Sequence, residues 1–156
     1  MRAGDVVAIR AVCRDDLDGW VALRHALWPD QSLESLRHEG QRFFDAALPT
    51  LEAVLVAHDQ TGRLIGFAEL SRRAYAEGCE TSPVGFLEGW YVAPESRGRG
   101  VGRALVHAAE QWARDLGCRE FASDTTVDNA ASAAAHAALG FEEVEQIRCF
   151  RKSLAR

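Results

Sequence analysis

The sequence lacks the features of a membrane protein, a metal site or a disulfide-stabilised fold. Its four cysteines are scattered without C-x-x-C spacing, so neither a metal site nor a disulfide framework is expected. No apolar run approaches the ~20 residues that a membrane helix requires. The first residues, M-R-A-G-D-V-V, are too short and too mixed for a secretion signal. These absences favour a cytoplasmic protein with reduced thiols and no membrane partner.

The chain also lacks a linker, an internal repeat and a low-complexity segment. With 156 residues, of which 47% are hydrophobic, it can bury one substantial core but not two. We therefore expect a single domain over residues 1–156. A formal net charge of −5 argues against nucleic acid as a partner, because nucleic acid usually demands a basic surface. The same charge permits a cationic small molecule.

Apolar periodicity and turn signals predict an α/β fold, with a mixed central sheet and helices on both faces. Strands are expected at residues 6–13, 52–58, 64–71, 84–92 and 120–123, and one or two more within 141–152. Expected helices run from Asp15 or Asp16 to residue 26, from the N-cap Ser32 to Pro49, from residue 101 to a stop at Gly117, and from Asn129 to Leu139. The apolar stripe of the third helix comprises Val101, Leu105, Ala108, Ala109, Trp112 and Leu116.

The most informative segment is R-G-R-G-V-G at residues 97–102, which lies between an expected strand and an expected helix. A glycine-rich turn at this place exposes backbone N–H groups beside the positive end of the helix dipole, where a pyrophosphate can bind. The spacing fits neither a Walker loop nor a Rossmann turn. A solvated arginine loop that caps the helix is the alternative.

The pattern Arg-x-x-Gly-x-Gly resembles the acetyl-CoA signature of the GNAT N-acetyltransferase superfamily, with Arg97, Gly100 and Gly102 at the signature positions. The resemblance implies that two strands splay apart near the loop and that acetyl-CoA lies in the opening. The cofactor-binding residues that it implies are Trp90, Tyr91, Val92, Arg97, Gly98, Arg99, Gly100, Val101, Gly102, Arg103 and Asn129. No metal is implied.

Longer segments are similar to aminoglycoside 6'-N-acetyltransferases within this superfamily. These segments are A-L-W-P, Y-A-E-G-C-E-T-S-P-V-G-F-L-E-G-W-Y-V, C-R-E-F-A-S-D-T-T and A-L-G-F-E-E-V-E, and the likeness spans residues 9–152. It implies acetyl transfer from acetyl-CoA to an amine of a polycationic amino sugar, and thus antibiotic resistance. An acceptor with several ammonium groups needs carboxylates in its pocket. The expected substrate-binding residues are Trp28, Gln31, Tyr75, Glu88, Asp124 and Glu145.

Each of these residues also has a structural explanation. Glu88 could face outward or pair with a core arginine, and Asp124 could simply form a turn. Trp28 follows the apolar face of a helix and could belong to the core. Trp and Tyr side chains can alternatively stack against a sugar face, which is the role that the resemblance implies for Trp28 and Tyr75.

The chemistry of acetyl transfer assigns two further roles. An ammonium group cannot attack a thioester, so a base must accept its proton, directly or through water, or the site must select the neutral amine. Asp124 is the candidate base, and a backbone N–H within residues 90–92 is expected to stabilise the oxyanion. Relatives often place a Tyr acid where this chain has His136, so His136 could protonate the leaving thiolate or only bind the cofactor. Asn129 could contact the pantetheine arm or cap the following helix.

Two other functions remain compatible with the sequence. The first is an acetyltransferase for a polyamine, a protein N-terminus or a lysine side chain, and the second is a noncatalytic acyl-CoA sensor. The C-terminal run V-E-Q-I-R-C-F-R-K-S-L alternates enough to form a strand. Because relatives often exchange such strands, we expect a homodimer.

Overall fold

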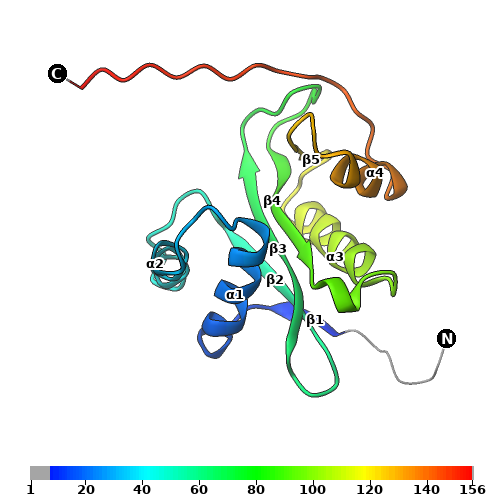
Figure 1. Cartoon of the computed structure of the whole chain (residues 1–156). Helices are drawn as coiled ribbons and strands as arrows, with labels where there is room; N and C mark the ends of the chain where they lie inside the picture. Colours follow the sequence, from blue (N-terminus) through cyan, green and yellow to red (C-terminus); the bar gives the residue numbers. More distant parts are fainter. Residues whose placement is uncertain (1–7, 156) are drawn as a thin grey trace.

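Five strands form one mixed sheet in the computed structural model, which describes residues 8–155 (Figure 1). Residues 6 and 7, expected to begin the first strand, lie outside the described residues. The strands follow one another across the sheet, and only the last pair is parallel. Their bounds are β1 Ala8–Ala11, β2 Ala53–His58, β3 Leu64–Arg73, β4 Val84–Val92 and β5 Phe121–Ser123. The expected hairpin between β2 and β3 is confirmed.

Helices cover both faces of this sheet, as the sequence predicted (Figure 1). One face carries α1 and α2, whereas α3 and α4 lie on the other side. The helices are α1 Leu17–Leu27, α2 Leu33–Phe44, α3 Val101–Asp115 and α4 Ala130–Ala138, with short 3-10 turns η1 at Arg14–Asp16 and η2 at Pro94–Ser96. This arrangement confirms the predicted α/β fold.

The helix ends differ in part from the sequence predictions. Ser32 caps α2 as predicted, because its Oγ accepts a hydrogen bond from the Ser35 N–H at 3.1 Å. Asp16 precedes α1, but its carboxylate binds Arg10 and the Cys13 N–H rather than the helix that follows. The prediction that α2 reaches Pro49 is wrong. The helix ends at Phe44, because the chain turns through Ala46 at a φ of 54°.

Two apolar layers hold the helices on the sheet. Trp20 of α1 and Phe67 of β3, both fully buried, are central to the layer beneath α1 and α2. On the opposite face the predicted stripe of α3 supplies Val101, Leu105 and Ala109. Leu116, predicted to belong to that stripe, is 39% exposed because it follows the last turn of α3. Both layers fix β4 between helices, which positions the site described below.

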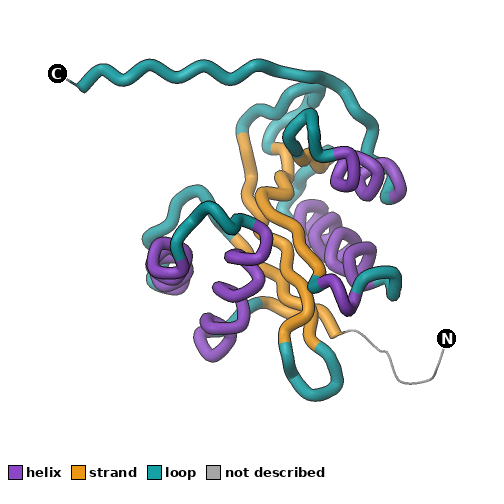
Figure 2. Tube along the Cα trace, in the orientation of Figure 1, coloured by secondary structure: helices purple, strands orange, loops and turns teal. Residues whose placement is uncertain are grey.

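The C-terminal segment contradicts one prediction. Residues 141–155 contain no strand, and the tail runs away from the sheet as an extended segment (Figure 2). A strand needs backbone hydrogen bonds from a neighbouring strand, and residues 141–155 pair with none of the five described strands. Phe150 and Leu154 are left 91% and 85% exposed.

Candidate functional site

The glycine-rich segment leads from η2 into α3 and presents its backbone outward. Gly98 and Gly100 have left-handed φ values of 75° and 83°, and no atom lies within 4 Å of a Cβ built at either position. The N–H groups of residues 98–103 donate no hydrogen bond to other described residues. These free donors lie at the positive end of the α3 dipole, so the loop can hold a diphosphate.

Arg97 fixes this loop to the end of β4. Its Nε donates a hydrogen bond to the Val92 carbonyl oxygen at 2.8 Å, and its guanidinium lies 5.3 Å from the centre of the Tyr91 ring. Arg99 and Arg103 are exposed beside it. The predicted cofactor residues from Tyr91 to Arg103 are therefore contiguous, although the side chain of Val101 is buried in the core and only its backbone belongs to the loop.

Gly102 serves a different purpose from the other two glycines. A Cβ at Gly102 would lie 3.1 Å from Cζ2 of Trp90, so the small residue lets that indole pack beneath the start of α3. The Trp90 Nε1 is buried and has no hydrogen-bond partner among the described residues. An unsatisfied buried donor is costly, so the packing of this indole beneath α3 has a free-energy cost that its apolar contacts must offset.

Next to the loop, β4 separates from β5. Pairing joins Gly85–Leu87 of β4 to Phe121–Ser123 of β5, and β4 then continues to Val92 with no other described strand on that edge. Glu88 is bulged, because Glu69 of β3 pairs with Gly89 whereas the next residue pairs with Leu87. Backbone groups between Glu88 and Val92 that point toward the opening are free to bind a ligand.

The two predicted carboxylates lie at the point where these strands separate. Glu88 and Asp124 each follow a residue of the last β4–β5 pair, Leu87 and Ser123. The Glu88 side chain is 24% exposed, and Asp124 is exposed. The structure thus brings together a carboxylate from β4 and one from the end of β5.

Sequence reasoning missed two partners of Glu88. The Ser71 hydroxyl donates to Glu88 Oε1, and Arg73 donates from Nε to Oε1 at 3.0 Å and from Nη2 to Oε2 at 2.8 Å. The hydrogen bond to Glu88 is the main cause that raises the pKa of Arg73, and Asp124 and Glu77 add to it electrostatically. Glu69, Ser71 and Arg73 occupy every second position of β3, so their side chains lie on one face of the sheet. This alternation of polar residues is the sequence signal from which the two partners of Glu88 could have been predicted.

His136 points inward rather than into open solvent. Its Nδ1 lies 2.7 Å from the Ser132 carbonyl oxygen, which can only accept, so Nδ1 carries a hydrogen. Its Nε2 lies 2.8 Å from the Ser123 Oγ, at the end of β5. Ser123, which the sequence did not single out, therefore lies between His136 and the strand opening. Asn129 caps α4, because its Oδ1 accepts from the Ser132 N–H at 3.0 Å.

The remaining predicted substrate residues lie in three places. Trp28 is half-buried against Phe67, and its ring would lie 2.8 Å from a Cβ at Gly89, so it lines the same face of β4 as Glu88. Tyr75 is 66% exposed on the loop between β3 and β4. Glu145 is exposed on the tail, next to Val144, which contacts Gly78 of that loop. Gln31 is exposed, and within residues 8–155 only its backbone forms hydrogen bonds.

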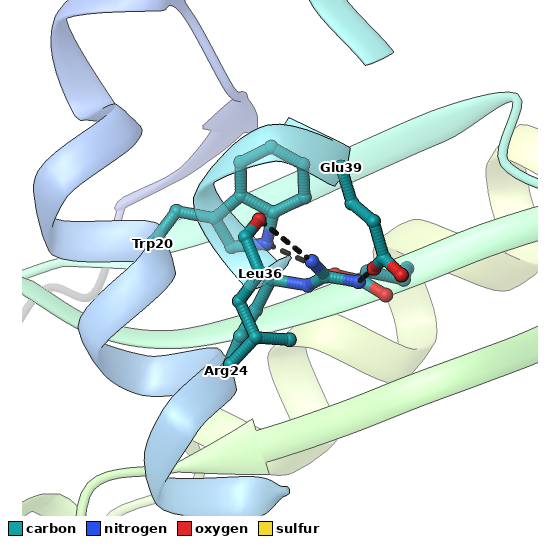
Figure 3. Close-up of polar contacts among 5 residues, drawn as sticks. Trp20, Arg24, Leu36 and Glu39 are labelled. Atoms are coloured by element: carbon teal, nitrogen blue, oxygen red, sulfur yellow. Dashed lines mark hydrogen bonds and ion pairs between the residues drawn. The ribbon is translucent and has the colours of Figure 1, made fainter. Parts of the chain in front are cut away.

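A buried ion pair centred on Arg24 joins α1 to α2 and β3 (Figure 3). Arg24 of α1 donates to Glu69 of β3 at 2.6 Å, to Glu39 of α2 at 2.9 Å and to the Leu36 carbonyl oxygen at 3.2 Å. The Trp20 Nε1 also donates to Glu69. Burial raises the pKa of the Glu69 carboxyl, and the Arg24 guanidinium opposes that shift. The pair lines a cavity of about 140 Å³ that also reaches Glu88.

Among residues 8–155 no group of His, Cys, Asp and Glu side chains is placed to hold a metal ion. Within the same range no helix combines the length and apolarity needed to cross a membrane. The four cysteines, all in the described part of the chain, are free thiols.

Comparison with known proteins gives a consistent result. The pattern of the acetyltransferase (GNAT) family matches residues 20–141. An aminoglycoside N(6')-acetyltransferase type 1 from Klebsiella aerogenes is 51% identical over 94% of this chain and 96% of its own length. The enzyme of the same name from Stenotrophomonas maltophilia is 47% identical over 94% and 93%.

Solved structures agree with these relatives. An aminoglycoside N-acetyltransferase in complex with CoA is 38% identical, with a TM-score of 0.87, covering 97% of this chain and 98% of its own. A complex of such an enzyme with the bisubstrate analogue CoA-S-monomethyl-acetylneamine is 39% identical, with a TM-score of 0.85, covering 94% and 98%.

Proposed function

The chain belongs to the acetyltransferase (GNAT) family, and we propose that it transfers the acetyl group of acetyl-CoA to the 6'-amine of an aminoglycoside. The observation that carries the proposal is nearly full-length similarity to enzymes of that activity. In this chain the opening between β4 and β5 lies next to the glycine-rich loop, which can hold a diphosphate, and next to an acidic face formed by the carboxylates Glu88 and Asp124. Acetylation turns an ammonium into a neutral amide. Resistance to aminoglycosides is therefore the expected phenotype.

The residues at the opening fit the cosubstrate. The free N–H groups of residues 98–103 can bind the diphosphate, and the β4 edge from Glu88 to Val92 can bind the pantetheine arm. Acetyl-CoA supplies an acetyl group that is already activated as a thioester. The protein itself therefore needs no nucleophilic serine or cysteine.

The protein's own groups have three tasks in this reaction. Asp124 accepts a proton from the acceptor ammonium, directly or through water, so that the amine can attack. Backbone N–H groups within residues 90–92 face the charge that develops on the carbonyl oxygen. His136 reaches the opening through the Ser123 hydroxyl, so we assign its acid role to a His136–Ser123 pair. Because Nδ1 holds its hydrogen on the Ser132 carbonyl oxygen, the pair delivers a proton only when Nε2 is protonated as well. The Nε2 proton then passes to Ser123 Oγ as the Ser123 hydroxyl proton passes to the leaving thiolate.

Transfer assays with a panel of amines test the proposed function. We expect acetylation of kanamycin- and tobramycin-type amino sugars and much slower reaction with polyamines, lysine and peptide N-termini. Mass spectrometry identifies the acetylated amine. If the protein acetylates no aminoglycoside but acetylates another amine, the acceptor assignment is wrong and the family chemistry stands. If it acetylates none while binding acetyl-CoA, it is an acyl-CoA sensor.

Substitution of Gly100 by Val tests the diphosphate cradle. Gly100 has a φ of 83° and open space around it, so the Val side chain projects to the place where a phosphate must meet the backbone. We expect CoA affinity, measured by calorimetry, to fall at least about tenfold, or ~1.4 kcal/mol.

Gly117→Val provides a matched control for backbone strain. Gly117 has the same φ of 83° and equally open surroundings, but it follows the other end of α3. This variant should lose a similar amount of stability and keep wild-type CoA affinity. Unaltered CoA affinity in folded Gly100→Val would remove the loop from the site.

We also propose that the protein is a homodimer in which the tail of each chain pairs with a second copy. Ile147, Phe150 and Leu154 are more than half exposed on a segment without backbone partners among the described residues. The outer edge of β5 has no strand partner within the described chain. A second copy could cover both, because an exposed edge and an apolar tail are complementary.

Deletion of residues 148–156 tests the dimer. Light scattering should give about twice 17.1 kDa for the full chain and a monomer mass for the shortened one. Thr61→Ala, in the exposed turn between β2 and β3, should leave the mass unchanged. A full chain that stays near 17.1 kDa at micromolar concentration would contradict the proposal.

The cellular location and the class of binding partner are also part of the proposal. We propose a cytoplasmic location, supported by four free thiols in the described chain. The formal charge of −5 supports a cationic small molecule as the partner rather than nucleic acid.

A further inference from the structure

The acidic face proposed to receive the acceptor already contains a cation of the protein itself. The Arg73 guanidinium forms two hydrogen bonds with the Glu88 carboxylate, one to each oxygen. It also lies 3.5 Å above the ring of Phe86, which fixes its plane. Arg73 is 39% exposed, so it borders the open side of the face rather than the core.

This arrangement uses most of the binding capacity of Glu88. A carboxylate offers about four lone-pair sites. Arg73 takes one site on each oxygen, and the Ser71 hydroxyl takes the second site on Oε1. Only one site, on Oε2, remains for an incoming ammonium. Glu88 therefore cannot bind a substrate cation fully while Arg73 stays in place.

The charges near Arg73 lead to the same conclusion. Asp124 and Glu77 both act electrostatically on the guanidinium, although neither is hydrogen-bonded to it. Arg73 thus neutralises one carboxylate of a group of three. The uncompensated negative charge is left on Asp124 and Glu77, and of these two Asp124 is exposed at the strand opening.

We propose that Arg73 is a specificity-determining residue that occupies Glu88 in place of a substrate ammonium and so weakens the binding of polycationic acceptors. The inference rests on the proposed aminoglycoside acceptor. An acceptor ammonium must displace Arg73 or share Glu88 with it, whereas Asp124 is available without competition. Arg73 thereby directs the reacting amine toward Asp124 and lowers the affinity for amines that would bind at Glu88.

Neamine, the amino sugar of the bisubstrate analogue, is a suitable probe because its binding can be measured without catalysis. We expect Arg73→Met to bind neamine about tenfold more tightly than the wild type by calorimetry at low salt, because one charge-assisted contact becomes free. The Met side chain can keep the contact with Phe86, so folding should be preserved. Arg73→Lys keeps the charge but not the two-point geometry, and its affinity should lie between the two.

Two controls separate this effect from a general change in charge. Arg72→Met removes the same charge from the neighbouring position of β3, where Arg72 pairs with Glu52 instead. Neamine affinity should change little in Arg72→Met. The gain from Arg73→Met should also disappear when Glu88→Gln is already present, because Glu88 is the group that is released.

The outcomes are distinguishable from those of the proposed function. Equal or weaker neamine binding by folded Arg73→Met, with wild-type acetylation intact, overturns this inference alone. The same gain in Arg72→Met, or a gain that persists with Glu88→Gln, overturns it as well. Tighter binding by Arg73→Met in a protein that acetylates no aminoglycoside supports the role of Arg73 and rejects the proposed function. Absence of neamine binding in every variant overturns both.

Discussion

Asp124→Asn is expected to lower kcat by roughly 10²-fold or more, the lower end of what a general base contributes. The amide keeps the shape of the carboxylate but cannot take the proton of the attacking amine. Asp124 is exposed at the strand opening, so the substitution should not affect folding. Steady-state kinetics with an amino sugar acceptor measures the effect, and calorimetry should show unchanged acetyl-CoA affinity.

Two variants delimit the role of this carboxylate. Asp128→Asn removes the same charge from the exposed segment that follows β5, and it should keep kcat within about twofold because Asp128 has no assigned role. Glu88→Gln should chiefly raise KM for the acceptor, because it removes the one carboxylate site left for an ammonium and leaves Arg73 without its ion-pair partner. A wild-type kcat and pH profile in Asp124→Asn would reject the base assignment. A loss well below 10²-fold would indicate a water relay or selection of neutral amine.

Arg24→Met is expected to have the largest effect on stability, a loss of about 3–5 kcal/mol in the free energy of unfolding. Glu69 is 4% exposed at its side chain, and Arg24 is its only charged hydrogen-bond partner among the described residues. Without the Arg24 guanidinium, the Glu69 carboxylate must either take up a proton or become exposed to water. Urea unfolding measures the change, and the slope should stay the same if the fold is kept.

The pH dependence gives this prediction a second readout. Burial already raises the pKa of Glu69, and without Arg24 it should rise further. A carboxyl whose folded pKa exceeds its unfolded pKa favours folding at low pH and opposes it as pH rises. The destabilisation of Arg24→Met relative to wild type should therefore grow from about pH 5 to about pH 8. A difference that does not depend on pH would contradict the explanation.

Two further variants complete the comparison. Arg14→Met breaks an ion pair with Asp45 in which both side chains are more than 60% exposed, so it should cost less than about 1 kcal/mol. Combining Arg24→Met with Glu69→Gln should restore much of the stability, because no buried charge then remains unpaired. If the double variant is no more stable than Arg24→Met, lost packing against Trp20 and Trp28 explains the effect instead.

The local parts of this protein could be predicted from its sequence. Ser32 is a good cap wherever an amphipathic run follows, and the glycines at 98 and 100 mark a turn that other residues adopt only with strain. The apolar spacing of α3 predicted which side it buries. Fold class and the conformation of the glycine-rich turn followed from such signals, because each depends on neighbours a few positions away.

The pairing of carboxylates could not be predicted in the same way. Arg73 and Glu88 come from different strands, and their contact depends on the β3–β4 register and on the bulge at Glu88. Likewise, Arg24 meets Glu69 only because α1 packs across β3. The sequence predicted as one alternative that Glu88 pairs with a core arginine, and its partner is an arginine, but one that is 39% exposed.

The C-terminal segment shows a second feature that could not be predicted from the sequence. Its alternating sequence is compatible with a strand, yet a strand forms only where a second strand supplies hydrogen bonds, and residues 141–155 pair with no strand of the described chain. The sequence by itself determined the elements, the family likeness and the loop that can hold a diphosphate. The tertiary structure alone decided which charges meet and which edges stay open, because those depend on contacts between residues far apart in the chain.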